Sequence, residues 1–348
     1  MIMENFFEII KKVVTSKAFK VTIKTLMITL ASVLAVLIIF IAGTFILTGI
    51  DKEPVEYSGT GYNPGIATDG TADVSAHRSG ADIYPENTLE AFINCVNSST
   101  FNTDIFEFDL HITADGVLIL LHDSTLDRTT DAVEYFGEKN VLPSEKTFKE
   151  LQKLNFGENF KNLNGEYPYR GLRGDDIPGT LRVVSLDAVL RFLEDNGNYQ
   201  YIIEIKDSGE LGCRAAQTLY ETLIKYDILD KAFVGTFNGD VTKYIDENLT
   251  GMLRSASIKE VVMFYTACAL NLDLEEGFFD YVALQIPHDG FVVFNLDSQR
   301  IIDYAHRYNI AVQYWTVNDP EKIKLLNDMG ADAIITDNPE MAYGLINA

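Results

Sequence analysis

Between residues 73 and 348, short apolar segments alternate with helical patterns about eight times. The strand candidates are 73–77, 104–110, 201–205, 232–236, 251–254, 281–286, 311–316 and 332–336. The helix candidates are 88–98, 185–195, 210–226, 239–247, 257–271, 297–308, 319–329 and 339–346. This alternation predicts a parallel (β/α)8 barrel, with a doubly wound open sheet as the alternative. No Gly-x-Gly-x-x-Gly follows the first strand, which weakens the dinucleotide-binding form of the open sheet.

The N-terminal region has a different character. Residues 25–50 form a run of 26 residues without a charge, longer than the roughly 20 that span a bilayer. We predict a single transmembrane helix; a cleaved signal peptide and a buried core helix are the alternatives. Five lysines precede the run and acidic residues follow it, so the positive-inside rule places residues 1–24 in the cytoplasm and the large domain outside.

Composition narrows the class of protein further. Residues 51–72 are rich in Gly, Pro, Thr and Asp and are predicted to be a linker, which leaves 73–348 as one domain. The chain beyond residue 24 holds 23 basic and 49 acidic residues, a net charge that repels nucleic acid. Three cysteines, Cys95, Cys213 and Cys268, form neither a disulfide framework nor a Cys-x-x-Cys zinc motif.

One further strand, 117–122, breaks the alternation. Only Thr113-Ala114-Asp115-Gly116 separates it from the preceding strand, which is too short for a parallel crossover and typical of a hairpin. If Asp115 and Gly116 are the two loop residues, Asp109 lies directly opposite His122, with Glu107 on the same face. A slip of one residue in the loop would separate these side chains.

Three carboxylates occupy strand positions that are otherwise apolar. Glu107 and Asp109 share one face of a strand, and Glu204 lies two residues before Lys206 in YIIEIK. Two like charges on a buried face cost stability unless a cation offsets them. We predict that Glu107, Asp109 and Glu204 hold a hard divalent cation. The alternatives are an ion pair with a nearby arginine and a simple pair between Glu204 and Lys206.

Two histidines complete the candidate site. His77 ends the first strand and is followed by Arg78, and His122 ends the hairpin. Histidines transfer protons, and cations such as Arg78 and Lys206 neutralise an oxyanion. An isolated histidine at a strand end is more often structural, but these two lie at depths equivalent to the three carboxylates. Together the residues suit phosphodiester hydrolysis.

Two further residues border this group. Trp315, the only tryptophan, ends a strand at the predicted mouth and is either core or a wall of the substrate site. Asn87 is predicted to cap the next helix, with Glu90 at its third position. Glu86 then either supports the metal ligands or favours the helix N-terminus.

In chain order, several strings closely resemble the glycerophosphodiester phosphodiesterase family. They are AHRSG with PENTLEAF (76–92), DIFEFDLHITADGVLILLHDSTLDRTT (104–130), YIIEIK (201–206), WTVN (315–318) and GADAIITDNP (330–339). The resemblance implies a TIM barrel, one divalent cation (Mg²⁺ or Ca²⁺) and hydrolysis of glycerophosphodiesters to glycerol 3-phosphate and an alcohol. It also implies a small cap inserted at about residues 131–180. The implied roles are acid/base catalysis for His77 and His122, metal binding for Glu107, Asp109 and Glu204, and phosphate contact for Arg78 and Lys206.

This chain departs from the family pattern at two places. Ser79 stands where the family usually has glycine, and it is expected either to restrict the pocket or to donate a hydrogen bond to the phosphate. Val184-Ser185-Leu186 replaces Pro-Thr-Leu, and Ser185 is still able to cap the following helix.

These expectations define a membrane-anchored, extracytoplasmic phosphodiesterase that binds its substrate through local cations and a metal. Two other functions remain open. In one, the substrate is a lysophospholipid or a lipid-linked polymer at the outer membrane surface. In the other, the domain is an inactive barrel that binds phosphate-bearing polymers without cleaving them, although its intact histidines and carboxylates argue against this.

Overall fold

The computed structural model describes residues 62–275, 277–288 and 295–348, together with Ser32, Ile38 and Gly43. The predicted basic N-terminus (1–24), all but three residues of the predicted membrane segment (25–50) and the first half of the predicted linker (51–61) lie outside these residues. Within the described part of the chain, every helix is too short or too polar to cross a bilayer.

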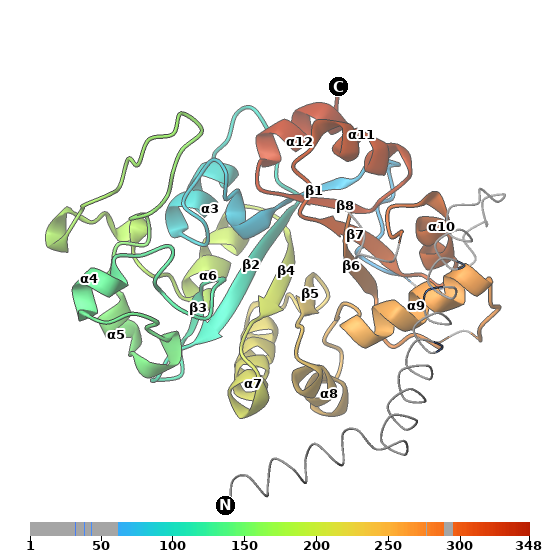
Figure 1. Cartoon of the computed structure of the whole chain (residues 1–348), viewed down its shortest axis with the longest axis horizontal. Coiled ribbons are helices and arrows are strands. Elements are labelled where there is room, and N and C mark those ends of the chain that lie inside the picture. Colours follow the sequence, from blue (N-terminus) through green and yellow to red (C-terminus); the bar gives the residue numbers. More distant parts are fainter. Residues whose placement is uncertain (1–31, 33–37, 39–42, 44–61, 276, 289–294) are drawn as a thin grey trace, which may run out of the picture.

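Parallel strands arranged in a ring form the centre of the molecule (Figure 1). The strands are β1 (Asp73–Ala76), β2 (Ile105–Ile112), β3 (Leu118–Leu120), β4 (Gln200–Ile205), β5 (Ala232–Gly235), β6 (Ala283–Pro287), β7 (Ala311–Trp315) and β8 (Ala333–Thr336). The order in the ring is β5-β4-β2-β1-β8-β7-β6, and β3 lies outside it, antiparallel to β2. Parallel bridges from Val234 to Arg254 and from Ser255 to Ala283 join β5 to β6. The predicted strand at 251–254 is therefore reduced to this bridge, and the ring closes as the TIM barrel that the alternation predicted.

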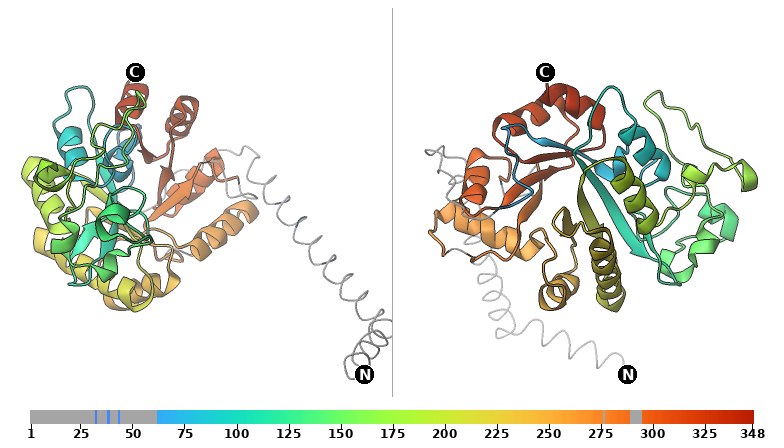
Figure 2. Two further views of the ribbon diagram at one scale, coloured as in Figure 1. Left: turned by 60° about the vertical axis from the view of Figure 1, so that its left-hand side comes forward. Right: turned by 180° about the vertical axis from the view of Figure 1, so that it is seen from behind.

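Helices lie around the outside of the strands, as the three views of Figures 1 and 2 show. They are α3 (Leu89–Val96), α4 (Ala132–Phe136), α5 (Phe148–Leu151), α6 (Leu186–Asn196), α7 (Gly209–Tyr226), α8 (Gly239–Asn248), α9 (Ile258–Leu270), α10 (Gln299–Arg307), α11 (Pro320–Asp328) and α12 (Pro339–Ile346). Ser185 caps α6 by accepting a hydrogen bond from the Ala188 backbone N–H, as predicted.

Side chains from alternate strand positions fill two separate layers. Inside the ring, small and aliphatic residues such as Ile105, Ala283 and Ala333 pack together with Phe233. Outside it, Phe106 and Phe108 of β2 pack against Phe92 of α3, with ring centroids 5.4 and 5.8 Å from Phe92. The same alternation that sends Phe106 and Phe108 outward directs the polar residues between them toward the barrel axis.

The hairpin differs from its predicted register by one residue. Leu110 pairs with Leu120 and Ile112 with Leu118, so Leu121, and not His122, lies opposite Asp109. The turn holds three residues, 114–116, where the prediction had two. Gly116 has φ +83°, a left-handed backbone conformation that is costly for a residue with a side chain. Leu121 packs among Ile119, Leu126 and Leu151 below the inserted segment. The strand ends before His122, and the following loop carries that residue to the barrel mouth.

The segment after the hairpin, predicted as an insertion at 131–180, forms α4, α5 and several single helical turns beside β3 (Figure 1). It has its own small apolar cluster, which includes Leu151, Leu154 and Phe156. Ile119 and Leu121 of the hairpin belong to the same cluster, so the inserted segment packs on this part of the hairpin.

The opposite end of the barrel carries an acidic group that should make stability depend on pH. Burial, followed by the nearby carboxylates of Asp104, Asp69 and Asp332, raises the pKa of Asp73 from 3.8 to about 7. Folded Asp73 then holds its proton more tightly than unfolded Asp73, so this group lowers the free energy of unfolding as pH rises from about 4 to about 7.

We therefore expect Asp73→Asn to raise the free energy of unfolding at pH 8 by roughly 2 kcal/mol. This is about half of the free energy that corresponds to the whole pKa shift, because the carboxylate is partly solvated. At pH 4 the variant and the wild type should be equally stable. Urea unfolding at both pH values measures this difference. A constant difference between the two proteins across the range would contradict the assignment.

Candidate active site

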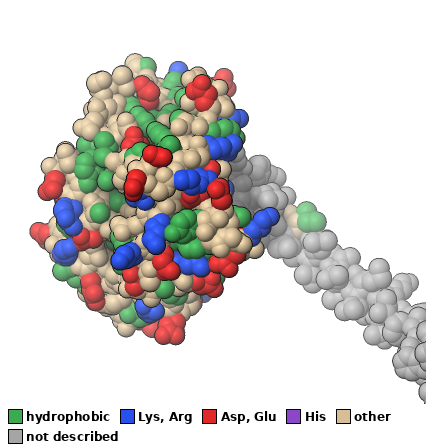
Figure 3. Space-filling view, turned by 90° about the vertical axis from the view of Figure 1, so that its left-hand side faces the viewer, with side chains coloured by type: hydrophobic (Ala, Val, Ile, Leu, Met, Phe, Trp, Pro, Cys, Tyr) green, Lys and Arg blue, Asp and Glu red, His purple; other side chains and the backbone are tan. Residues whose placement is uncertain are grey.

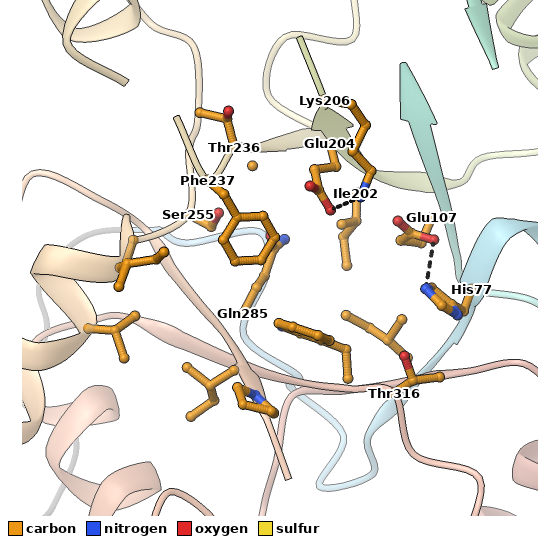
Figure 4. A pocket seen from close by; sticks show the side chains of 18 of the residues that line it. His77, Glu107, Ile202, Glu204, Lys206, Thr236, Phe237, Ser255, Gln285 and Thr316 are labelled. Atoms are coloured by element: carbon orange, nitrogen blue, oxygen red, sulfur yellow. Dashed lines mark ion pairs between the residues drawn. The ribbon is translucent and has the colours of Figure 1, made fainter. Parts of the chain in front are cut away.

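A cavity of about 280 Å³ opens where the strands end, and most of the predicted site residues line it. Those residues are His77, Arg78, Glu107, His122, Glu204, Lys206 and Trp315. Asp109 and Glu86 do not line the cavity but contact residues that do. Figure 4 shows His77 beside Glu107, and Glu204 beside Lys206, on one side of this space.

Strand register explains why side chains from three distant segments meet. Ala76, the last residue of β1, pairs with Phe106, so His77 comes level with Glu107. Asp109 pairs directly with Glu204 across β2 and β4. Because parallel strands present their carboxyl ends at the same edge, the polar residues at these ends converge.

His77 is held by a partner that the sequence reasoning missed. Its Nδ1 lies 2.5 Å from Asp337 Oδ1, and its Nε2 lies 3.9 Å from Glu107 Oε2. Burial alone would lower the pKa of His77, but Glu107 and Asp337 outweigh it and raise that pKa above 6.5. Asp337 directly follows β8, so its position after a buried strand was a usable signal in the sequence.

His122 is held in a comparable way. Its Nδ1 lies 2.8 Å from Asp123 Oδ1. Burial lowers the pKa of His122, and the nearby Asp109 and Asp123 offset this only in part. The pKa values of His77 and His122 are thus displaced in opposite directions, a difference that would suit a proton donor and a proton acceptor in one site.

An arginine that the sequence reasoning also missed connects the second histidine to the rest of the site. Arg128 donates to Asp123 through Nε at 2.6 Å and Nη2 at 2.9 Å, and to the two oxygens of Glu86 at 2.8 and 2.7 Å. Burial raises and the Arg128 hydrogen bonds lower the pKa of Asp123, which falls to about 2. Glu86 in turn accepts from Arg78 at 3.2 Å. Glu86 therefore joins two arginines, which neither predicted role for it included.

The carboxylates lie among cations. Lys206 Nζ is 3.0 Å from Asp109 Oδ1 and 2.8 Å from Glu204 Oε2. Arg78 Nε is 3.6 Å from Asp109 Oδ2, and the Arg78 backbone N–H donates to Glu107 at 2.7 Å. Burial, together with the negative charge of Asp109, raises the pKa of Glu107 to about 7. Burial would raise the pKa of Asp109, but Lys206, His122 and Arg78 outweigh it and lower that pKa. Burial raises the pKa of Glu204 in spite of Lys206, so Glu107 and Glu204 are both less completely neutralised than Asp109.

The predicted helix cap was wrong by one residue, and the difference matters for the site. Thr88, not Asn87, caps α3 by accepting a hydrogen bond from the Ala91 backbone N–H. Asn87 instead has φ 56° and donates from Nδ2 to Asp109 Oδ2 at 3.0 Å. The amide of Asn87 thus orients a predicted metal ligand.

Ser79 takes up a conformation that explains why glycine suits its position. Its φ of 63° lies in the left-handed region that side chains disfavour. The residue is buried, and it is not among the described residues that line the cavity. Contact between its hydroxyl and the phosphate stays a prediction.

Glu107, Asp109 and Glu204 supply carboxylate oxygens, which are the ligands that a hard divalent cation prefers. Asp109 Oδ1 is buried and accepts no hydrogen bond of good geometry from the described residues, although Lys206 Nζ lies near it. In the present arrangement, no three acidic, histidine or cysteine side chains of the described ranges surround a common point. Lys206 lies between Asp109 and Glu204, and an ion and this ammonium group would compete for the same oxygens.

Comparisons with known proteins show what the chain is similar to. A family model described as the "Glycerophosphoryl diester phosphodiesterase family" matches residues 77–341. The glycerophosphodiester phosphodiesterase of Caldanaerobacter subterraneus subsp. tengcongensis is 27% identical over 277 residues, which cover 78% of this chain and 97% of the relative. Glycerophosphodiester phosphodiesterase 1 of Bos taurus is 38% identical over 145 residues, covering 42% of this chain and 37% of that protein.

Solved structures share the fold. A putative glycerophosphoryl diester phosphodiesterase from Silicibacter pomeroyi has a TM-score of 0.64 at 17% identity, over 81% of this chain and 95% of that one. A phosphodiesterase from Oleispira antarctica, solved in complex with the product sn-glycerol-3-phosphate, has a TM-score of 0.59 at 20% identity, over 80% of this chain and 98% of that one.

Proposed function

This chain belongs to the glycerophosphoryl diester phosphodiesterase family and is a phosphodiesterase, and we propose that it hydrolyses glycerophosphodiesters to glycerol 3-phosphate and an alcohol. The observation that carries the proposal is one cavity in which two histidines, each hydrogen-bonded through Nδ1 to an aspartate, face buried carboxylates and two cations. The relative from Caldanaerobacter, named for this activity, and the solved product complex support the substrate class.

The proposed reaction is an in-line displacement at phosphorus, in which the site residues have separate roles. One histidine accepts the proton of the nucleophile, and the other donates a proton to the departing alkoxide oxygen. The nucleophile is water or the neighbouring glycerol hydroxyl of the substrate, which would give a cyclic phosphate first. Arg78 and Lys206 offset the charge that builds on the non-bridging phosphate oxygens.

Glu107, Asp109 and Glu204 would hold the divalent cation, Mg²⁺ or Ca²⁺. When bound, such an ion supplies positive charge to a phosphate oxygen. It would also offset the repulsion between Glu107 and Asp109, which the two cations of the chain leave partly uncompensated. Asn87 would keep Asp109 oriented by its hydrogen bond to Oδ2.

The test is an assay of the full chain in detergent with glycerophosphocholine, glycerophosphoethanolamine and glycerophosphoglycerol, in the presence of Mg²⁺, Ca²⁺ or Mn²⁺. We expect release of glycerol 3-phosphate from at least one of the diesters. No release under any of these conditions would contradict the proposal. If phosphate-bearing polymers nevertheless bound, the alternative of an inactive binding domain would take its place.

Arg128 offers a prediction about positioning. The side chain does not line the cavity, but its four hydrogen bonds hold Asp123 against His122 and Glu86 against Arg78. We expect Arg128→Ala to lower kcat by about 10–100-fold with little change in KM, because His122 and Arg78 lose their fixed orientation. Added guanidinium ion should restore part of the loss.

Arg191→Ala is the matched control, since Arg191 also pairs with a carboxylate but lies on the exposed face of α6. It should retain wild-type kcat. Retention of full activity by Arg128→Ala, or a loss that guanidinium leaves unchanged, would show that Arg128 does not position the site.

We also propose that the chain is anchored in a membrane by residues 25–50, with the catalytic domain on the extracytoplasmic side. The uncharged run and the lysines before it support this placement. Membrane fractionation, followed by protease treatment of intact cells, tests it. Recovery of the full chain in the soluble fraction would contradict the anchor.

A further inference from the structure

The cavity has two unlike halves. Charged residues form one wall, including His77, Glu107 and Lys206, and apolar residues form the other. The apolar wall consists of Phe237, Ile258, Val262, Pro287, Leu296 and Trp315. Figure 4 shows Phe237 on the side of the space away from His77 and Glu107.

The apolar wall is open to solvent at its edge. Phe237 is 56% exposed, Ile258 53% and Val262 41%, although all three line the cavity. Ile258 and Val262 are four residues apart on α9 and therefore share one face of that helix. Single exposed apolar residues are ordinary, but these three border one cavity, and exposed apolar residues gathered at a cavity are a feature of ligand-binding sites.

Part of this wall is aromatic. The rings of Phe237 and Trp315 meet edge to face with centroids 6.1 Å apart. Three polar residues, Thr236, Ser255 and Gln285, lie beside Phe237 in Figure 4, but apolar residues outnumber them, so the hydroxyls or ammonium group of a small polar alcohol would find few partners along the wall. Such a group would lose hydrogen bonds to water on entering and gain little in return.

We propose that this half of the cavity binds a hydrocarbon chain, so that the preferred substrate is a glycerophosphodiester carrying a single chain. The inference rests on the proposed phosphodiesterase function and specifies its substrate class. A volume of about 280 Å³ lies just below the range of about 300–1,000 Å³ for small-molecule pockets, which fits one chain beside the phosphate rather than two. The chain is attached either to the departing alcohol or to the glycerol, since both place hydrocarbon next to the phosphate.

Two substrate series distinguish these attachments when they are assayed with the full chain held in a lipid-free amphipathic polymer. One series is glycerophospho-n-alkanols with two to eight carbons, and the other is 1-acyl-glycerophosphocholines of the same chain lengths, all below the concentration at which they form micelles. Each methylene that enters the apolar half should raise kcat/KM about fourfold, until the wall is covered. A rise in either series supports the proposal and identifies the side that carries the chain.

A flat dependence on chain length in both series would overturn the inference, while cleavage of the two-carbon member would leave the proposed function intact. If no member were cleaved, the proposed function itself would fail. Equal cleavage of a two-chain phosphatidylcholine would also overturn the inference. So would a chain-length effect that depended on added lipid vesicles, because the apolar residues would then contact a lipid surface instead.

Paired variants on α9 test the residues. Ile258→Ser with Val262→Ser should reduce the increase per methylene to less than about twofold, because hydrocarbon would then meet hydroxyls. Met263→Ser with Leu270→Ser is the matched control, since these residues are 44% and 50% exposed on the same helix and do not line the cavity. The control should keep the wild-type dependence. If kcat/KM of the Ile258→Ser, Val262→Ser variant depended on chain length as in the wild type, α9 would not be part of the binding site. If that variant failed to fold, the wild-type series would still decide the proposal.

Discussion

Replacing His77 or His122 with asparagine should lower kcat by about 10²–10⁴-fold, because each substitution removes one of the two proton transfers of the proposed reaction. Asparagine keeps much of the size and polarity of the ring, so the fold should remain. Single-turnover and steady-state assays at saturating substrate measure the effect. The double variant should lose little more than the worse single variant, since the two histidines act in one reaction.

His306→Asn provides the control for these variants. His306 also pairs with an aspartate, at 2.8 Å between Nε2 and Asp332 Oδ2, but it is not among the described residues that line the cavity. We expect it to reduce stability and to leave kcat unchanged wherever the protein is folded. Wild-type kcat in either His77→Asn or His122→Asn would refute the catalytic role of that histidine.

Removal of the divalent cation should have an effect of similar size. After dialysis against a chelator, we expect the rate to fall at least about 100-fold and to return when Mg²⁺ or Ca²⁺ is added, since such an ion contributes several kcal/mol to stabilising the phosphoryl transition state. Calorimetry should show one cation bound per chain and a higher melting temperature in its presence.

Glu204→Gln tests the ligand set separately from catalysis. Loss of this carboxylate should weaken cation binding in calorimetry, even with no substrate present. Glu194→Gln is a suitable control, because Glu194 also pairs with a lysine but lies outside the cavity. Full activity of the chelated wild type, or unchanged cation binding in Glu204→Gln, would show that the carboxylates serve Lys206 and Arg78 alone.

Several individual positions show where sequence reasoning was sufficient. The alternation of periods along the chain predicted β1, β2 and β4 to β8 and the helices that follow them, because a buried parallel strand and an amphipathic helix leave different apolar patterns. It was wrong at 251–254, which forms only a bridge, and it did not predict α4 and α5 of the inserted segment. Glu107 and Asp109 could be recognised because charged residues are unexpected in a strand of Ile, Phe and Leu. His77 and Glu204 could be placed near them because parallel strands end at one edge.

Other positions depended on geometry that no local pattern contains. The loop conformation, not the hydrophobic pattern, set the hairpin register, so His122 reaches the site through the loop after β3 and not through pairing with Asp109. Thr88 competes with Asn87 for the same helix cap, and only the packed structure shows that Asn87 bonds Asp109 instead.

The sequence by itself determined which elements form and which charged groups meet at the end of the barrel, because these follow from periodicity and from the common direction of parallel strands. The tertiary structure alone decided how those groups are held: Asp337 on His77, Arg128 between Asp123 and Glu86, and an apolar wall facing the charged one. Such contacts join residues far apart along the chain, and their distances depend on how loops fold over the strand ends, which residue spacing does not encode.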